Sequence, residues 1–205
     1  MVTMPASLSF AEAASVPLGG LNALHFMRKA DIRHGDKVLI NGAGGSIGAF
    51  AVQIAKSMGA VVTAVDSNIK EPMLRALGAD HFVDYAEEDF TRRGDTYDVI
   101  FSMVAKTSYS GCIRALKPGG RYVMANPKLS DMLRSPLTPR RANRKVLFAF
   151  AGEKEEELLE LKRMIDAGEI SATVDKIYPM AEAAQAHQRV ETEQRLGTVI
   201  ISMDG

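Results

Sequence analysis

The chain has 205 residues, of which 46% are hydrophobic and 24% are charged, and its 25 Lys and Arg balance its 25 Asp and Glu. This composition is typical of a soluble globular domain, and a net charge of zero provides no general attraction to nucleic acid or to an acidic membrane. No apolar run approaches the roughly 18 residues of a membrane span, and the first residues lack the basic start and apolar centre of a signal peptide. We therefore expect a cytoplasmic protein that binds neither nucleic acid nor membranes.

Helical and strand-like segments alternate along the chain. Helical spacing predicts a lead-in helix over 8–30, interrupted by Pro17 and Gly19-Gly20, and then helices over 50–59, 71–80, 108–120, 153–170 and 180–194. Short apolar runs predict strands over 37–41, 60–66, 81–85, 97–104, 121–126, 145–151 and 198–202, whereas residues 127–144 are expected to be irregular. Because continuous apolar strands are typical of a sheet covered by helices, we expect an α/β fold with a doubly wound parallel sheet of about six strands and helices on both faces.

A glycine-rich loop, NGAGGSIG, occupies residues 41–48, between a strand and a helix. The dinucleotide motif G-x-G-x-x-G fails when it starts at Gly42, since its third position falls on Ile47. Started at Ala43, it places glycines at Gly45 and Gly48. Gly45 would then let the backbone approach a pyrophosphate and Gly48 would let the helix pack on the strand, with Gly42 and Gly44 easing the turn. The N–H groups of 45–48 would face the phosphates at the start of the helix.

The next strand ends in Asp66, which lies 18 residues after Gly48. An acid about 20 residues beyond the glycine loop is typical of a carboxylate that binds the ribose hydroxyls of a dinucleotide. Two alternatives remain open from the residues alone. The loop could be a turn without a ligand, and Asp66 could be a solvated acid at the end of a strand.

The segment VLINGAGGSIGAFAVQIAKSMGA resembles the nucleotide-binding domain of the medium-chain dehydrogenase/reductase superfamily, in its zinc-independent, quinone-oxidoreductase-like branch. The resemblance continues through RALGADHFVDYAEEDF, YDVIF, ALKPGGRYV and YPMAEAAQAHQRVETEQRLGTVIIS. It implies a Rossmann fold over 1–205, with a helical lead-in at 1–35. It also implies that the terminal strand, within 196–205, pairs with a GroES-like catalytic domain that is absent from this chain, so that the strand lacks its usual neighbours here.

The same resemblance implies an oxidoreductase that transfers a hydride to or from a carbonyl, quinone or enone substrate, with this chain alone incomplete for catalysis. Relatives that use zinc take a cysteine ligand from the segment matching SVPLGGLNA, where this chain has Leu18, so we expect no zinc. In many relatives the strand matching Lys145–Ala151 pairs across a two-fold axis. This implies a homodimer through an edge strand, the alternative being an ordinary interior strand.

The motif and the resemblance together predict the cofactor-binding residues, which are Asn22, Gly42, Ala43, Gly44, Gly45, Ser46, Ile47, Gly48, Asp66, Ser67, Lys70, Tyr85, Met103, Val104 and Asn126. Asp66 would repel a 2′-phosphate, which favours NAD over NADP. Ser67, Lys70 and Tyr85 instead match positions around the 2′-phosphate in NADP-using relatives. Lys70 could pair with that phosphate, or it could be a solvated lysine at a helix start.

The nicotinamide end departs from the family pattern at Asn22, at Ser102-Met103-Val104-Ala105 and at Ala125-Asn126. These departures motivate a non-catalytic nucleotide-binding domain as one alternative. An S-adenosylmethionine-dependent methyltransferase is another, although its loop needs no glycine at position 48. We nominate no catalytic residue. Cys112, the single cysteine, is expected to be a small buried residue, and the run EKEEE at 153–157 to be a solvated helix start.

Overall fold

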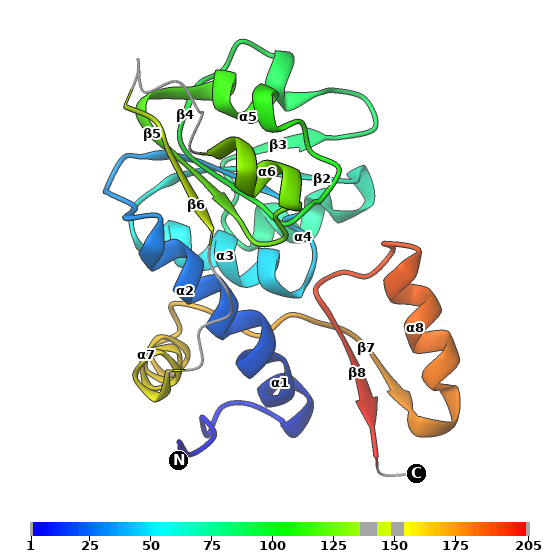
Figure 1. Ribbon diagram of the computed structural model, residues 1–205. Helices are drawn as coiled ribbons and strands as arrows, with labels where there is room; N and C mark the ends of the chain where they lie inside the picture. Colours follow the sequence, from blue (N-terminus) through cyan, green and yellow to red (C-terminus); the bar gives the residue numbers. More distant parts are fainter. Residues whose placement is uncertain (1, 136–142, 149–153, 204–205) are drawn as a thin grey trace.

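The computed structural model describes residues 2–135, 143–148 and 154–203 (Figure 1). Six parallel strands form one sheet: β1 (Lys37–Asn41), β2 (Val61–Asp66), β3 (His81–Asp84), β4 (Tyr97–Ser102), β5 (Leu116–Met124) and β6 (Lys145–Phe148). Their order across the sheet is β3-β2-β1-β4-β5-β6. The chain thus proceeds outward from β1 in one direction and then restarts at β4 in the other, as in a Rossmann fold. This confirms the predicted fold class.

Helices cover the sheet on both faces, and alternate residues of each strand belong to two separate cores. In β1, Val38 and Ile40 face the first core, and Leu39 faces the second. The helices with residues in the first core are α2 (Leu21–Lys29), α3 (Ser46–Ser57), α4 (Glu71–Ala76) and α7 (Glu155–Asp166). The second core lies under α5 (Tyr109–Ala115) and the short helix η3 (Phe90–Arg92). Burial on both faces explains the nearly continuous apolar strands.

A separate two-stranded parallel sheet follows α7. It consists of β7 (Val174–Pro179) and β8 (Thr198–Ser202), joined by η6 (Met180–Glu182) and α8 (Ala183–Glu191). The sequence predicted β8 but assigned no strand over 174–179, and the structure pairs β8 with β7 along one edge. A backbone bridge between Gly45 and Gly197 joins this unit to the glycine loop. In Figure 1 the unit lies beside the main sheet, near α1 (Phe10–Ser15).

The lead-in is continuous, contrary to the expected interruption at Pro17 and Gly19-Gly20. A π-helix, η1 (Val16–Gly20), connects α1 directly to α2. Pro17 has no N–H to donate to the preceding turn, and the switch from α to π geometry at this point accommodates a proline inside a continuous helix. A Cβ at Gly19 would lie 3.0 Å from the Ser46 carbonyl oxygen, and one at Gly20 would lie 3.2 Å from a Leu161 methyl group. The two glycines therefore let the lead-in pack closely on α3 and α7.

Two further boundaries differ from the prediction. The helix expected over 108–120 ends at Ala115, because Leu116 is already extended and Pro118 cannot continue a helix. The segment 127–144, expected to be irregular, begins with α6 (Leu129–Arg134), while residues 136–142 lie outside the described residues. β6 is the edge strand of the sheet over 145–148, and residues 149–151 of the predicted strand also lie outside the described residues.

Candidate functional site

The glycine loop connects the end of β1 to the start of α3. Gly42 has a φ of +89°, a left-handed conformation that favours glycine, so it makes the turn. A Cβ at Gly48 would lie 2.4 Å from the Gly42 carbonyl oxygen and 2.5 Å from that of Ala43. Gly48 therefore permits the close packing of helix on strand that the motif requires. The N-cap residue of α3 is Gly45, which has no side chain to cap the helix, so the first-turn N–H groups, at Ser46, Ile47 and Gly48, point towards the loop without intrahelical partners.

Gly44 and Gly45 face different neighbours. The Gly44 N–H donates to Asp66 Oδ2 over 2.7 Å, and a Cβ at Gly44 would lie only 2.3 Å from Lys70 Cδ. Gly44 was expected merely to ease the turn, but it is the glycine that the acid and the lysine approach closely. Gly45 precedes α3 in extended conformation, and a Cβ there would lie 3.4 Å from Arg195 Nη2. The space beside Gly45 is thus the more open of the two.

Asp66 and Lys70 form a buried ion pair beside the loop. Asp66 is 5% exposed and Lys70 is 1% exposed, and Lys70 Nζ lies 2.9 Å from Asp66 Oδ1. The same carboxylate accepts the N–H groups of Gly44 and Ser67. Three of the roughly four acceptor positions of a carboxylate are therefore engaged. Both solvated interpretations, of Asp66 as a strand-end acid and of Lys70 as a helix-start lysine, are wrong for this structure.

Tyr85 lies at the same edge of the sheet. The parallel pairing of β2 with β3 puts Asp84 level with Asp66, and the Tyr85 N–H donates to the Asp66 carbonyl oxygen over 3.3 Å. The Tyr85 side chain is largely exposed. The fold therefore brings Ser67, Lys70 and Tyr85 together around Asp66, although they are separated by up to 19 positions in the sequence.

The segment 192–197, which we call the C-terminal segment, also lies against the glycine loop. Gly197 donates its N–H to the Gly44 carbonyl oxygen over 2.9 Å. Arg195 lies beside Gly45 and donates to the Val190 carbonyl oxygen over 2.7 Å. Sequence reasoning missed this segment, because it follows the loop by about 150 positions and no motif spacing connects the two. Its only sequence signal is an arginine two residues before a glycine.

Neutral polar side chains occupy the other half of the site, where β1 and β4 end. Asn41 Nδ2 donates to Thr107 Oγ1 over 2.7 Å and lies 3.2 Å from Ser102 Oγ. Thr107 Oγ1 also donates to the Val104 carbonyl oxygen over 2.8 Å. Strand order reverses between β1 and β4, and ligands of open α/β sheets bind at such a switch point. The network holds the two strand ends together there.

Met103 and Val104 lie beside Gly42, and Asn126 is joined to Met103. The Met103 N–H donates to the Asn41 carbonyl oxygen, and Asn126 Nδ2 donates to the Met103 carbonyl oxygen over 3.0 Å. A Cβ at Gly42 would lie 3.3 Å from a Val104 methyl group. Asn22 is different, because its side-chain amide donates to the Leu18 carbonyl oxygen in η1 over 2.7 Å. The lead-in approaches α3 nearby, where Gly19 lies close to Ser46.

Two titratable residues outside the loop, Cys112 and Glu157, are buried and contribute to packing. Cys112 is fully buried, and this burial raises the pKa of its thiol to about 12. A thiolate is therefore absent at neutral pH, which agrees with the predicted packing role. Glu157 contradicts the expectation of a fully solvated run at 153–157, since it is buried and lies 3.2 Å from His25 Nδ1. This contact joins α7 to α2.

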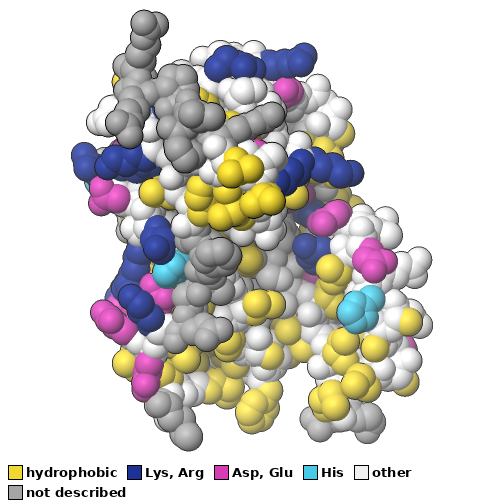
Figure 2. Space-filling view, viewed as in Figure 1, with side chains coloured by type: hydrophobic (Ala, Val, Ile, Leu, Met, Phe, Trp, Pro, Cys, Tyr) yellow, Lys and Arg dark blue, Asp and Glu magenta, His cyan; other side chains and the backbone are white. Residues whose placement is uncertain are grey.

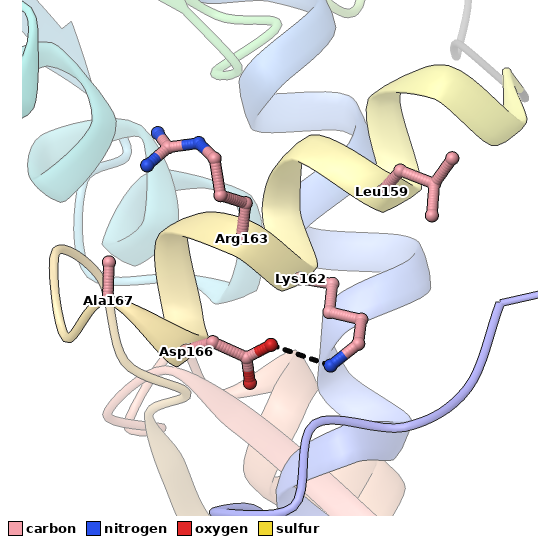
Figure 3. A pocket seen from close by; sticks show the side chains of 5 residues that line it. All are labelled: Leu159, Lys162, Arg163, Asp166 and Ala167. Carbon is pink, nitrogen blue, oxygen red and sulfur yellow. Dashed lines mark hydrogen bonds and ion pairs between the residues drawn. The ribbon is translucent and has the colours of Figure 1, made fainter.

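A further hollow lies on the surface of α7. It is shallow and is lined by Leu159, Lys162, Arg163, Asp166 and Ala167 (Figure 3), and its Lys162 and Asp166 are paired with each other over 2.6 Å. Within the described part of the chain, His, Cys, Asp and Glu side chains form no group of three or more that could hold a metal ion. No helix there has both the length and the apolar character needed to cross a membrane.

Comparison with known proteins identifies the family of this chain. A sequence model of the zinc-binding dehydrogenase family matches residues 77–201, which is more than half of the chain. The 2-methylene-furan-3-one reductase of Solanum lycopersicum is 29% identical over 202 residues, which cover 96% of this chain and 48% of that enzyme.

Solved structures show the same relation in three dimensions. A quinone oxidoreductase from Coxiella burnetii superposes with a TM-score of 0.87 at 28% identity, covering 98% of this chain and 63% of that one. A structure described as an NAD-dependent alcohol dehydrogenase superposes with a TM-score of 0.84 at 27% identity, covering 98% of this chain and 61% of that one. The chain thus spans about half to two thirds of the length of these relatives, in their cofactor-binding part. It belongs to the zinc-binding dehydrogenase family and is a nucleotide-binding domain of the medium-chain dehydrogenase/reductase type.

Proposed function

We propose that this chain is the NAD-binding domain of an oxidoreductase that transfers a hydride to or from a carbonyl, quinone or enone. The observation that carries the proposal is the contact between Gly44 and Asp66, at the carboxyl edge of the sheet and next to an uncapped α3. The relatives are reductases and dehydrogenases, and nothing among them supports the methyltransferase alternative. When bound, the nicotinamide ring would supply or accept the hydride.

The loop fits the diphosphate of such a cofactor. The first-turn N–H groups of α3, at Ser46, Ile47 and Gly48, and the positive end of the helix dipole favour an anion. Arg195 adds a guanidinium group beside Gly45. Two positive features next to each other repel unless an anion lies between them, and the partner of Arg195, Glu193, is 62% exposed. A diphosphate would satisfy both, so we assign Arg195 to its binding together with Gly42, Ala43 and the loop.

Asp66 would hold the adenosine ribose, but Lys70 would have to move first. Two ribose hydroxyl groups need two acceptor positions, and Lys70 occupies one of the positions on Asp66. Its aliphatic stem also covers Gly44. We therefore infer that Lys70 leaves Asp66 when the ribose binds. Because the Asp66 carboxylate would repel a 2′-phosphate on the ribose that it holds, we favour NAD over NADP, with Ser67 and Tyr85 flanking the ribose.

The nicotinamide would lie between the ends of β1 and β4. The residues that we assign to this half are Asn22, Met103, Val104 and Asn126, and none of them ionises near neutral pH. Their role is therefore to position the ring and to shield it from water, and we assign no proton transfer to them. The substrate pocket and any proton donor would come from a catalytic domain like the remaining part of the relatives.

Other expectations remain part of the proposal. Apolar side chains are exposed where α1, β7 and η6 gather, among them Phe10, Ile177 and Met180 (Figure 2). This surface is suited to a catalytic domain. Among the described strands β6 is paired along one edge alone, and its other edge is suited to a homodimer. We further propose that the enzyme does not use zinc, because Leu18 stands where zinc-using relatives have a cysteine. We also propose that the protein is cytoplasmic.

Calorimetric titration with NAD, NADP and S-adenosylmethionine tests the proposal directly. We expect saturable binding of NAD, weaker binding of NADP and none of S-adenosylmethionine. Arg195→Gln should weaken NAD binding about tenfold, since a charge-assisted hydrogen bond to phosphate is lost. Arg163→Gln on α7 removes the same charge far from the loop in sequence and should have no effect. Binding of S-adenosylmethionine alone would overturn the proposal. Failure to bind any of the three compounds would also overturn it, because the loop would then be a turn that binds no nucleotide.

A further inference from the structure

Four charged side chains form a row of alternating sign across the glycine loop. Lys70 Nζ lies 2.9 Å from Asp66 Oδ1 and 3.9 Å from Glu193 Oε2. The same Glu193 oxygen lies 3.3 Å from Arg195 Nη1. The lysine is thus flanked by two carboxylates, one buried at the end of β2 and one exposed in the C-terminal segment.

The backbone fixes the place of Glu193. Its φ of +56° is a left-handed conformation that ends α8, and its N–H donates to the Val190 carbonyl oxygen over 3.2 Å. Arg189 of α8 pairs with Asp175 of β7, which ties the helix to the two-stranded sheet. Beyond Glu193 the chain is joined to the glycine loop through Gly197. Since it is anchored on both sides, the carboxylate is held next to Lys70.

We propose that Glu193 determines the cofactor class by excluding a 2′-phosphate from the ribose end of the site. This inference rests on the proposed function, in which the ribose binds Asp66 and displaces Lys70. Glu193 is then the nearest remaining carboxylate for the displaced ammonium group. When Lys70 is paired with Glu193, it is not available to bind a 2′-phosphate. That phosphate would lie next to two carboxylates and one ammonium group, whose net charge is negative and repels it. A ribose with a free 2′-hydroxyl meets no such repulsion.

The test uses ADP-ribose and 2′-phospho-ADP-ribose, because both lack the nicotinamide and depend on the described part of the site. Wild-type chain should prefer ADP-ribose. Glu193→Gln should shift the ratio of the two dissociation constants about tenfold towards the 2′-phosphate form, and salt should reduce the shift because Glu193 is largely exposed. Glu191→Gln, which removes the same charge from the last turn of α8, is the matched control and should leave the ratio unchanged.

The outcomes separate the two proposals. An unchanged ratio in Glu193→Gln, or an equal shift in Glu191→Gln, would overturn the role of Glu193 while the cofactor domain stands. A wild-type preference for 2′-phospho-ADP-ribose would overturn that role and the assignment of NAD together. Failure of wild-type chain to bind either compound would overturn the proposed function and this inference with it. The urea midpoint of each variant, compared with wild type, shows that the fold is retained.

Discussion

Aspartate–lysine pairs occur at both ends of the parallel sheet, but their surroundings differ. At the amino end, Asp98 pairs with Lys117 over 2.7 Å and also accepts the N–H of Lys37 at the start of β1. Asp80 and Lys56 form a second such pair, over 2.8 Å. In both pairs the side chains remain between 24% and 36% exposed. These carboxylates tie neighbouring strands together at the surface.

At the carboxyl end, the Asp66–Lys70 pair has nearly the same separation, 2.9 Å, but its side chains are only 7% and 2% exposed. Its carboxylate accepts an N–H from a glycine loop instead of from a strand. An aspartate–lysine pair is therefore no sign of a site by itself. Burial next to a glycine loop at the switch point is what distinguishes the candidate site from a structural tie.

Removal of the lysine should separate the two kinds of pair most clearly. Lys70→Met should lower the free energy of unfolding by about 3 kcal/mol, because it leaves the buried Asp66 carboxylate without its cation. Lys117→Met should cost about 1 kcal/mol or less, because water screens that pair. Urea denaturation of both variants measures the difference. Equal losses would show that burial does not distinguish the two ends.

Close packing at the loop should give the next largest effect. Gly48→Ala should lower the free energy of unfolding by about 2 kcal/mol, since its Cβ would meet backbone atoms that cannot move aside. Gly45→Ala should cost less than about 1 kcal/mol, because its Cβ would meet only the end of Arg195. Thermal unfolding of both variants checks this order. A larger loss for Gly45→Ala would contradict the assigned roles.

The amino-end pairs should contribute a small dependence on pH. Burial alone would raise the pKa of Asp98, but hydrogen bonds from Lys117 and from the Lys37 N–H hold it below its ordinary value of 3.8. A carboxyl group with a lowered pKa in the folded state stabilises the fold above its unfolded pKa, and this contribution is lost as pH falls through the folded pKa. Asp98→Asn should therefore flatten the fall in stability between about pH 5 and pH 2. Identical slopes in wild type and variant would refute this.

The sequence alone determined the features that depend on neighbours along the chain. Apolar runs and helical spacing predicted six parallel strands and the helices between them, and the spacing from Gly48 to Asp66 placed the acid at the edge of the sheet. The close-packing role of Gly48 also followed from the motif. These features could be predicted because backbone periodicity and turn geometry act over short distances in the sequence.

Only the tertiary structure decided what lies against the loop. The burial of Lys70, the pairing of β7 with β8, and the approach of Glu193 and Arg195 all depend on contacts between segments far apart in the sequence. A lysine near a helix start is normally solvated, and here a buried carboxylate and the bare surface of Gly44 hold it inside. No local pattern encodes such contacts, because they arise when separate elements pack and bring their charges into a shared environment of low polarity.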